Sequence, residues 1–284
     1  MRACSYNRWM SEAPVHPFDE IVQMPERDIR LASAALLFAT DAYPHLEIGR
    51  YLSRLDCLAH RVESRAGRTP FGRLAALRQV ICVEEEYRGN KDSYYDPRNS
   101  YLNEVLDRHL GIPITLSALW LDVAWRLGWP LAGVNFPGHF LLRYEACSGP
   151  IYIDAFEQGA ILSECDLRKR LSAQLCQSGR IPPEFLATAG TKAVLMRMLN
   201  NLLGIYLQQC NWQAAEPILA RQVALCPEDA DLWCLRGQIY LHLHQCERAV
   251  ACLEHSLELT GCHPGSATVQ RYLLAARKRL AESN

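Results

Sequence analysis

Hydrophobic positions recur at helical spacing through the first third of the chain. Residues 28–44 carry their apolar side chains on one stripe, and residues 45–65 and 71–86 repeat this pattern. We therefore expect three amphipathic helices in this part. Residues 1–26 combine prolines with mixed charge and show no such stripe, so we expect them to form a flexible N-terminal segment.

The most apolar stretch follows in the middle of the chain. Residues 114–127 predict a helix that is buried on most sides, because its polar positions are confined to one narrow stripe. Pro113 stands in the first turn of this helix, where its missing N–H costs little. Residues 101–110 predict a shorter helix before it, and Gly128 marks the end of the long one.

The pattern then changes to short strands. Residues 132–136, 139–144 and 151–154 are strand-like runs separated by turn residues. Residues 161–178 again predict a helix, and residues 178–185 contain glycine and prolines typical of a linker. This order predicts the α+β class, with a helix-rich core and a small antiparallel sheet.

The last third of the chain contains an internal repeat. Like residues recur at an offset of 34 positions: Tyr206 and Tyr240, Ala215 and Ala249, Leu219 and Leu253. This is the period of tetratricopeptide repeats, which are pairs of antiparallel helices. The repeat predicts an all-α, tetratricopeptide-like region over residues 191–284, closed by a capping helix over residues 267–282.

Composition places this chain among soluble globular proteins. Of its 284 residues 49% are apolar, and the formal net charge is −1, so charge gives no reason to expect nucleic acid or an anionic membrane as partner. The first residues lack a secretory signal, and the twelve cysteines are scattered without a C-x-x-C pair. We expect a cytoplasmic protein with three parts: residues 1–26, 27–180 and 191–284.

His139 and Asp154 are the leading candidates for chemistry. A histidine oriented by a carboxylate is the arrangement of a general base, and a gap of fifteen residues fits two adjacent strands, one carrying each residue. The alternative is a buried strand histidine satisfied by a local carboxylate.

A second candidate cluster lies at residues 94–99. Tyr95 and Asn99 are candidate binding residues that line a cleft beside His139, while the alternative is a capping loop packed by tyrosines. The groups His242, His244 and Cys246, and Cys262 with His263, match no standard zinc spacing. We expect no metal site and no cofactor.

Four motifs connect the chain to a known family. The segments YYDPRNSYLNEVL, GIPITLS, GVNFPGHFLLRY and IDAF resemble the pattern of bacterial SirB-type proteins, which join a transglutaminase-like, papain-like core to a tetratricopeptide-like tail. The resemblance implies that His139 and Asp154 hold the places of the histidine and aspartate of the transglutaminase triad.

The resemblance also shows what is missing. In active transglutaminase-like enzymes the nucleophile is a cysteine in G-x-C at the start of the helix, and here that position is Pro113. The nearest cysteines in the sequence are Cys82 and Cys147. Thr115 and Ser117 are hydroxyl alternatives that His139 would have to activate, or else structural groups that cap the helix. Both therefore stand as candidate binding or reacting residues.

Two functions remain open. The first is a non-catalytic transglutaminase-like protein that binds a protein or peptide through its cleft and its helical repeats, with no nucleic-acid or membrane partner and an open oligomeric state. The second is a hydrolase or acyl transferase that acts on amide or thioester bonds through His139 and Asp154. Pro113 favours the first, because proline supplies neither thiol nor donor.

Overall fold

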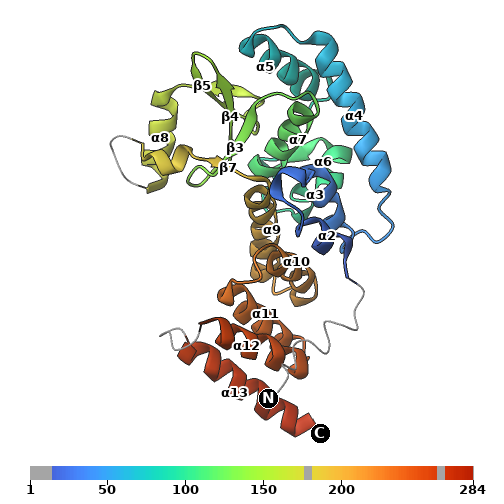
Figure 1. Cartoon of the computed structure of the whole chain (residues 1–284), viewed down its shortest axis with the longest axis vertical. Helices are drawn as coiled ribbons and strands as arrows, with labels where there is room; N and C mark the ends of the chain where they lie inside the picture. Colours follow the sequence, from blue (N-terminus) through green and yellow to red (C-terminus); the bar gives the residue numbers. More distant parts are fainter. Residues whose placement is uncertain (1–14, 176–180, 261–265, 284) are drawn as a thin grey trace. The chain divides into compact units, whose positions relative to one another are not determined.

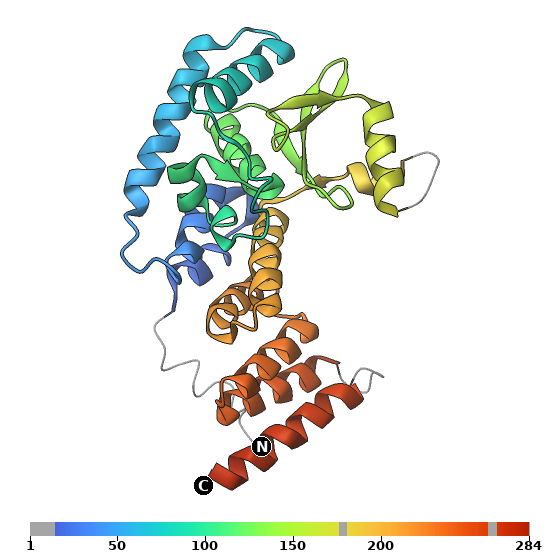
Figure 2. The ribbon, with the colours of Figure 1, turned by 180° about the vertical axis from the view of Figure 1, so that it is seen from behind.

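The computed structural model describes residues 15–175, 181–260 and 266–283 (Figures 1 and 2). These residues form two compact units. The larger unit is Pro25–Met198, and the smaller unit combines the described residues up to Met24 with those from Leu199 onwards. Each unit has its own cluster of buried apolar side chains.

Helices make up most of the larger unit. Their bounds are η1 (Glu26–Asp28), α3 (Leu31–Ala39), α4 (Ile48–Arg65), α5 (Pro70–Arg78), the π-helix η2 (Gln79–Glu84), η3 (Pro97–Asn99), α6 (Leu102–Arg108), α7 (Pro113–Arg126), α8 (Glu164–Leu175) and η4 (Pro183–Leu186). Helix α9 (Thr191–Gln208) begins in this unit. The expected helices over residues 28–44 and 45–65 correspond to α3 and α4. The third continues beyond α5 as a π-helix, a change of winding that apolar spacing does not reveal.

The main sheet has five antiparallel strands in the order β6-β5-β4-β3-β7. The strands are β3 (Leu131–Val134), β4 (Leu141–Ala146), β5 (Gly149–Asp154), β6 (Ala160–Leu162) and β7 (Thr188–Ala189). The three expected strands correspond to β3, β4 and β5. Strands β6 and β7 were not expected, because runs of two or three residues are too short to show alternation.

Two predictions about this sheet need correction. His139 does not lie on a strand: its N–H donates to the carbonyl of Phe136 at 3.0 Å, so it stands in the turn before β4. The Pro-Gly pair at positions 137 and 138 makes a turn that extends one residue further than the sequence suggests. The segment after the expected linker also returns to the sheet as β7, so the larger unit continues to Met198 rather than ending at residue 180.

Helix α7 is the centre of the larger unit. All residues from Pro113 to Ala124 are buried, and the helix packs against β3 and β4. On the other side of the sheet, α8 packs Leu167 and Leu171 into a cluster with residues of β3 and β4 and the turn between them. The sheet is therefore sandwiched between α7 and α8, as Figures 1 and 2 show.

A pair of short parallel strands leads into α7. Strand β1 (Arg88–Gly89) pairs with β2 (Leu110–Gly111), and the backbone N–H of Asn90 extends this ladder to the carbonyl of Gly111 at 2.9 Å. The segment around Gly89 is thereby held beside the chain that enters the first turn of α7.

The N-terminal segment differs from its prediction. Residues 1–14 lie outside the described residues, but helix α2 (Pro17–Ile21) follows, and Phe18 and Val22 are fully buried. The His16 side chain accepts the N–H of Phe18 at 3.1 Å and so caps this helix. A single short turn of helix has too few residues to form a recognisable stripe, which is why the flexible assignment over residues 1–26 fails in its last part.

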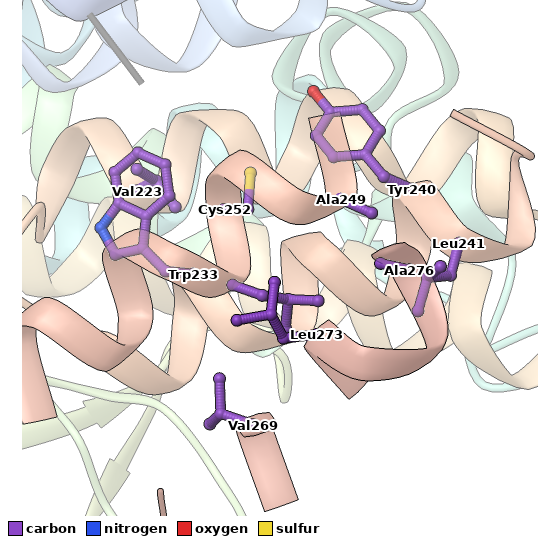
Figure 3. Packing of buried hydrophobic residues seen from close by; sticks show 10 residues of the cluster. Val223, Trp233, Tyr240, Leu241, Ala249, Cys252, Val269, Leu273 and Ala276 are labelled. Carbon is purple, nitrogen blue, oxygen red and sulfur yellow. The ribbon is translucent and has the colours of Figure 1, made fainter. Parts of the chain in front are cut away.

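The smaller unit is all-helical. It contains α10 (Trp212–Leu225), α11 (Ala230–His242), α12 (Cys246–Thr260) and α13 (Ser266–Ser283). Figure 3 shows the apolar cluster between the last three helices, where Trp233 and Tyr240 lie with Ala249 and Ala276. A Cβ on Gly237 would lie 2.6 Å from the Leu253 side chain, so α11 and α12 approach closely there. The assignment of these helices to tetratricopeptide repeats stays a prediction.

Within the described ranges, no helix is both long enough and apolar enough to cross a lipid bilayer.

Candidate functional site

The structure brings His139 and Asp154 together. The Nε2 atom of His139 lies 3.0 Å from Oδ1 of Asp154. The Asp154 side chain is fully buried, whereas 17% of the His139 side chain is exposed. The last residue of β5 thus supplies a buried carboxylate, and the turn before the neighbouring strand supplies an imidazole that solvent reaches.

Asp154 is held by more groups than His139. Its Oδ1 also accepts the backbone N–H groups of Phe156 at 2.9 Å and Glu157 at 3.2 Å. Its Oδ2 lies 2.7 Å from Nη2 of Arg170 on α8, as an ion pair without the direction of a good hydrogen bond. Burial raises the pKa of Asp154, but the hydrogen bond and charge of His139, the charge of Arg170 and the N–H of Glu157 outweigh it and hold the pKa below its usual range.

This geometry assigns different roles to the two imidazole nitrogens. A hydrogen bond from Nε2–H to the ionised Asp154 leaves Nδ1 with its lone pair when the ring is neutral. In the part of the chain that the structure describes, the Asp154 contact is the one hydrogen bond of the His139 side chain. Nδ1 is therefore the nitrogen that can accept a hydrogen bond or a proton from a ligand.

Aromatic rings extend from the His139 ring towards the surface. Phe156 meets His139 edge-on at 6.1 Å between ring centroids, and Tyr94 meets Phe156 in the same way at 6.1 Å. Tyr95 follows at 5.3 Å from Tyr94 and is 68% exposed. A Cβ on Gly89 would lie 2.5 Å from the Phe156 ring, so β1 supports this row of rings from below.

The loop that carries the tyrosines is fixed from beneath by buried amides. Asn99 is fully buried, and its Nδ2 donates to the carbonyls of Ser93 at 2.7 Å and Tyr94 at 3.2 Å. Asn90 donates to Oδ1 of Asn99 at 3.0 Å. Asn99 therefore holds the tyrosine loop from its buried side. The burial of Asn99 agrees with the alternative interpretation of residues 94–99 as a capping loop. Tyr95 is the exposed member of the predicted pair.

The first turns of α7 contain no accessible hydroxyl. Thr115 and Ser117 are both fully buried. The Thr115 hydroxyl donates to the Asn99 carbonyl at 2.7 Å and accepts the N–H of Ile112 at 3.1 Å, which is the capping role that the sequence left open. Ser117 Oγ has no hydrogen-bond partner in the described structure. Pro113 is itself buried at the first helical position.

Contacts of β1 and β2 connect the start of α7 with the surroundings of His139. Gly111 of β2 directly precedes the helix start and pairs with Gly89 of β1, and Gly89 contacts Phe156 beside His139. Strands β1 and β2 thus connect the chain that enters α7 with the aromatic ring beside His139.

Arg170 is the residue of this site that sequence reasoning missed. It lies in the expected helix over residues 161–178, where nothing in the apolar spacing distinguishes it from Arg168 two residues earlier. Only the packing of α8 on the sheet places its guanidinium at Asp154. The sequence signal that could have found Arg170 is a charged residue on the face of α8 that packs against the sheet.

The described residues contain no group of three His, Cys, Asp or Glu side chains placed to hold a metal ion. The His242 ring stacks on Trp212 at 4.1 Å instead. Cys262 and His263 lie outside the described residues.

Two hollows lie elsewhere on the larger unit. A pocket of about 610 Å³ lies beside the C-terminal end of α7, next to Asp122, Trp125 and Arg126. A second, of about 520 Å³, lies between the sheet and α8, next to Arg143 and Tyr152. Neither is lined by His139 or Asp154, so the pair is not at the bottom of either hollow.

Comparison with known proteins shows which family this chain resembles. The family model described as "Transglutaminase-like superfamily" matches residues 49–200. A UPF0162 protein of Xylella fastidiosa is 34% identical over 247 residues, which cover 85% of this chain and 88% of that protein. A UPF0162 protein of Vibrio cholerae is 27% identical and covers 76% and 78% of the two chains.

A longer protein shares the same region. Mouse F-box only protein 21 is 34% identical over 186 residues, which cover 60% of this chain and 28% of that protein. The family match covers more than half of the chain and includes α7, the His–Asp pair and α8. The chain belongs to the transglutaminase-like superfamily.

Proposed function

We propose that this protein is a non-catalytic member of the transglutaminase-like superfamily that binds a peptide segment of a partner protein at the His139–Asp154 pair. The observation that carries the proposal is Pro113. In active transglutaminase-like enzymes the nucleophile at this position is a cysteine, and proline has no atom that attacks an acyl carbon. The histidine and aspartate remain in hydrogen-bonding geometry with each other.

No other described residue takes over the nucleophile's place. Thr115 and Ser117 are buried, and the Thr115 hydroxyl is already used by the backbone. Burial raises the pKa of the Cys82 thiol to about 12, which makes it a poor nucleophile at neutral pH. Cys147 follows the far end of β4, about 20 Å along the strand from His139.

The surroundings of His139 suit peptide recognition. Tyr94 and Tyr95 present rings at the surface on a loop fixed by buried amides, so little conformational freedom is lost when a ligand binds. His139 Nδ1 offers an acceptor for a backbone N–H. The tetratricopeptide-like helices that the sequence predicts would add a second surface for the same partner.

The mouse relative supports a modular role. There the similar region occupies 28% of a longer protein, so a region like this one also occurs within a larger chain. A domain that recognises a partner is readily used in this way, although the partner itself need not be the same.

A selection with displayed peptides tests the proposal. A random peptide library on phage is selected against immobilised full-length protein, and the enriched peptides are measured on His139→Ala and Tyr95→Ala variants. His60→Ala, an exposed histidine on α4, is the matched control. The proposal predicts a loss of affinity of about tenfold or more for both site variants and none for the control. Equal binding by all four proteins would contradict it.

The second candidate is a hydrolase that works without a covalent step. The observation in its favour is the orientation of His139, whose Nδ1 is left available by the Asp154 hydrogen bond. Nδ1 would take a proton from water while the water oxygen attacks the acyl carbon. The C–N or C–S bond of the substrate would then break, and the proton on Nδ1 would pass to the leaving amine or thiol. A positioned base of this kind contributes about 10²–10⁴-fold. Turnover of a thioester or activated amide that His139→Ala abolishes, with the fold intact, would establish this function instead.

A further inference from the structure

Arg170, Asp154 and His139 form a row of three ionisable side chains, with the aspartate in the middle. One carboxylate oxygen of Asp154 faces His139 Nε2 at 3.0 Å, and the other faces Arg170 Nη2 at 2.7 Å. One helical turn later, Gln174 lies against the turn before His139, because a Cβ on Gly138 would be 2.4 Å from its side chain. Helix α8 therefore contacts both Asp154 and the turn that carries His139.

The other titratable groups around the pair do not compensate Asp154. Lys91 and Glu157 approach Phe156 but pair with each other at 2.8 Å, so their charges cancel locally. Tyr94 contributes a neutral ring. Among the described residues, Arg170 is thus the one Lys or Arg side chain that lies directly on the carboxylate, and it opposes the negative field that His139 would otherwise meet.

This compensation decides which form of the imidazole is favoured. A bare carboxylate stabilises an imidazolium, which a cysteine enzyme needs in order to hold its thiolate. A carboxylate already paired with an arginine stabilises the imidazolium much less. A site with Pro113 has no thiolate to hold, so the loss of the nucleophile and the presence of Arg170 point to the same protonation state.

We propose that Arg170 is a positioning residue that keeps His139 neutral, with Nδ1 as a hydrogen-bond acceptor, so that the site takes ligands that present an N–H or O–H donor, such as a peptide amide. The proposal rests on the proposed binding function, whose ligand it specifies. The proposal also gives a reason for the surroundings of Asp154. One oxygen of its buried carboxylate faces three N–H donors, and the other faces an arginine.

A titration of His139 by NMR tests the role of Arg170. The full-length protein is labelled with ¹⁵N-histidine, and the His139 signal is identified by its loss in His139→Gln. Arg170→Ala removes the compensating charge, and we expect the His139 titration midpoint to rise by about 0.5–1 pH unit, a three- to tenfold change. Arg168→Ala is the control, because this arginine on the same helix pairs with Glu164 at 2.5 Å.

The remaining outcomes are also decisive. Arg170→Lys keeps the charge and should leave the midpoint near that of the wild type; it serves as the reporter if Arg170→Ala fails to fold, compared then with Arg170→Gln. A midpoint that is unchanged or lower without the charge, or that moves equally in Arg168→Ala, overturns the role of Arg170. No ligand is present in this titration, so its failure leaves the peptide-binding result unaffected.

Discussion

The imidazole of His139 and the carboxylate of Asp154 meet at 3.0 Å although fifteen residues separate them in the sequence. The antiparallel pairing of β4 and β5 brings them together, because Leu142 lies opposite Ile153 in the register. A turn before one strand and the end of its neighbour thus form the site.

Removal of the Asp154 side chain should destabilise the protein. Asp154→Ala leaves the N–H groups of Phe156 and Glu157 and the imidazole of His139 without their acceptor in a buried place. We expect a loss of about 3 kcal/mol in the free energy of unfolding, measured by denaturant titration. Glu164→Ala, at an exposed carboxylate on α8, should change it by less than about 0.5 kcal/mol. An equal effect of both variants would show that Asp154 carries no such network.

Stability should depend on pH through Asp154. Its pKa is lower in the folded protein than in the unfolded chain, so the ionised carboxylate stabilises the fold fully above the unfolded pKa of about 3.9. This contribution is lost as the pH falls through the folded pKa. The difference in free energy of unfolding between wild type and Asp154→Asn should therefore be constant near neutral pH and shrink below about pH 4. A difference that stays constant into the acid range would contradict the lowered pKa.

A methyl group at Gly89 should disturb the site from a distance. Its Cβ would lie 2.5 Å from the Phe156 ring, which borders His139. We expect Gly89→Ala to lose about 1–3 kcal/mol of stability and to shift the NMR signals of His139. Gly49→Ala on α4 has open space at this position and should be neutral or slightly stabilising. Unchanged His139 signals in a folded Gly89→Ala protein would refute the contact.

A methyl group at Gly237 should loosen the packing of α11 against α12. Gly237→Ala places a Cβ 2.6 Å from the Leu253 side chain, so α11 and α12 must separate. Hydrogen exchange of the full-length protein should then become faster in these two helices. Gly204→Ala, where nothing lies within 4 Å, is the control and should leave exchange as it was. Slow exchange in both variants would mean that the helices do not approach closely at Gly237.

The sequence predicts the elements of the core better than the details of the site. Apolar periodicity is strong in α4, whereas α7 is recognised as a nearly all-apolar run whose first turn the proline at position 113 marks correctly. It cannot place His139, because the turn after β3 is set by backbone hydrogen bonds within the loop. The sequence does not predict Arg170 as a site residue for a similar reason, since its contact with Asp154 depends on how α8 packs on the sheet.

Short elements are the other limit. Strand β7 has two residues and is defined by its partner β3, so the segment that contains it looks like part of a linker until the sheet is seen. Helix α2 depends on a cap from His16 and on two buried side chains, Phe18 and Val22, rather than on a long stripe. Tertiary contacts decide both elements, and no single stretch of sequence contains that information.

We propose that Pro113 stands where a nucleophile would face His139. Pro113→Cys tests it, with alkylation by iodoacetamide followed for each cysteine by peptide mass mapping and Cys147 in its exposed turn as internal reference. The account predicts that adding His139→Ala lowers the rate of the introduced thiol relative to Cys147 by about tenfold. A relative rate that is the same with and without His139 would contradict it.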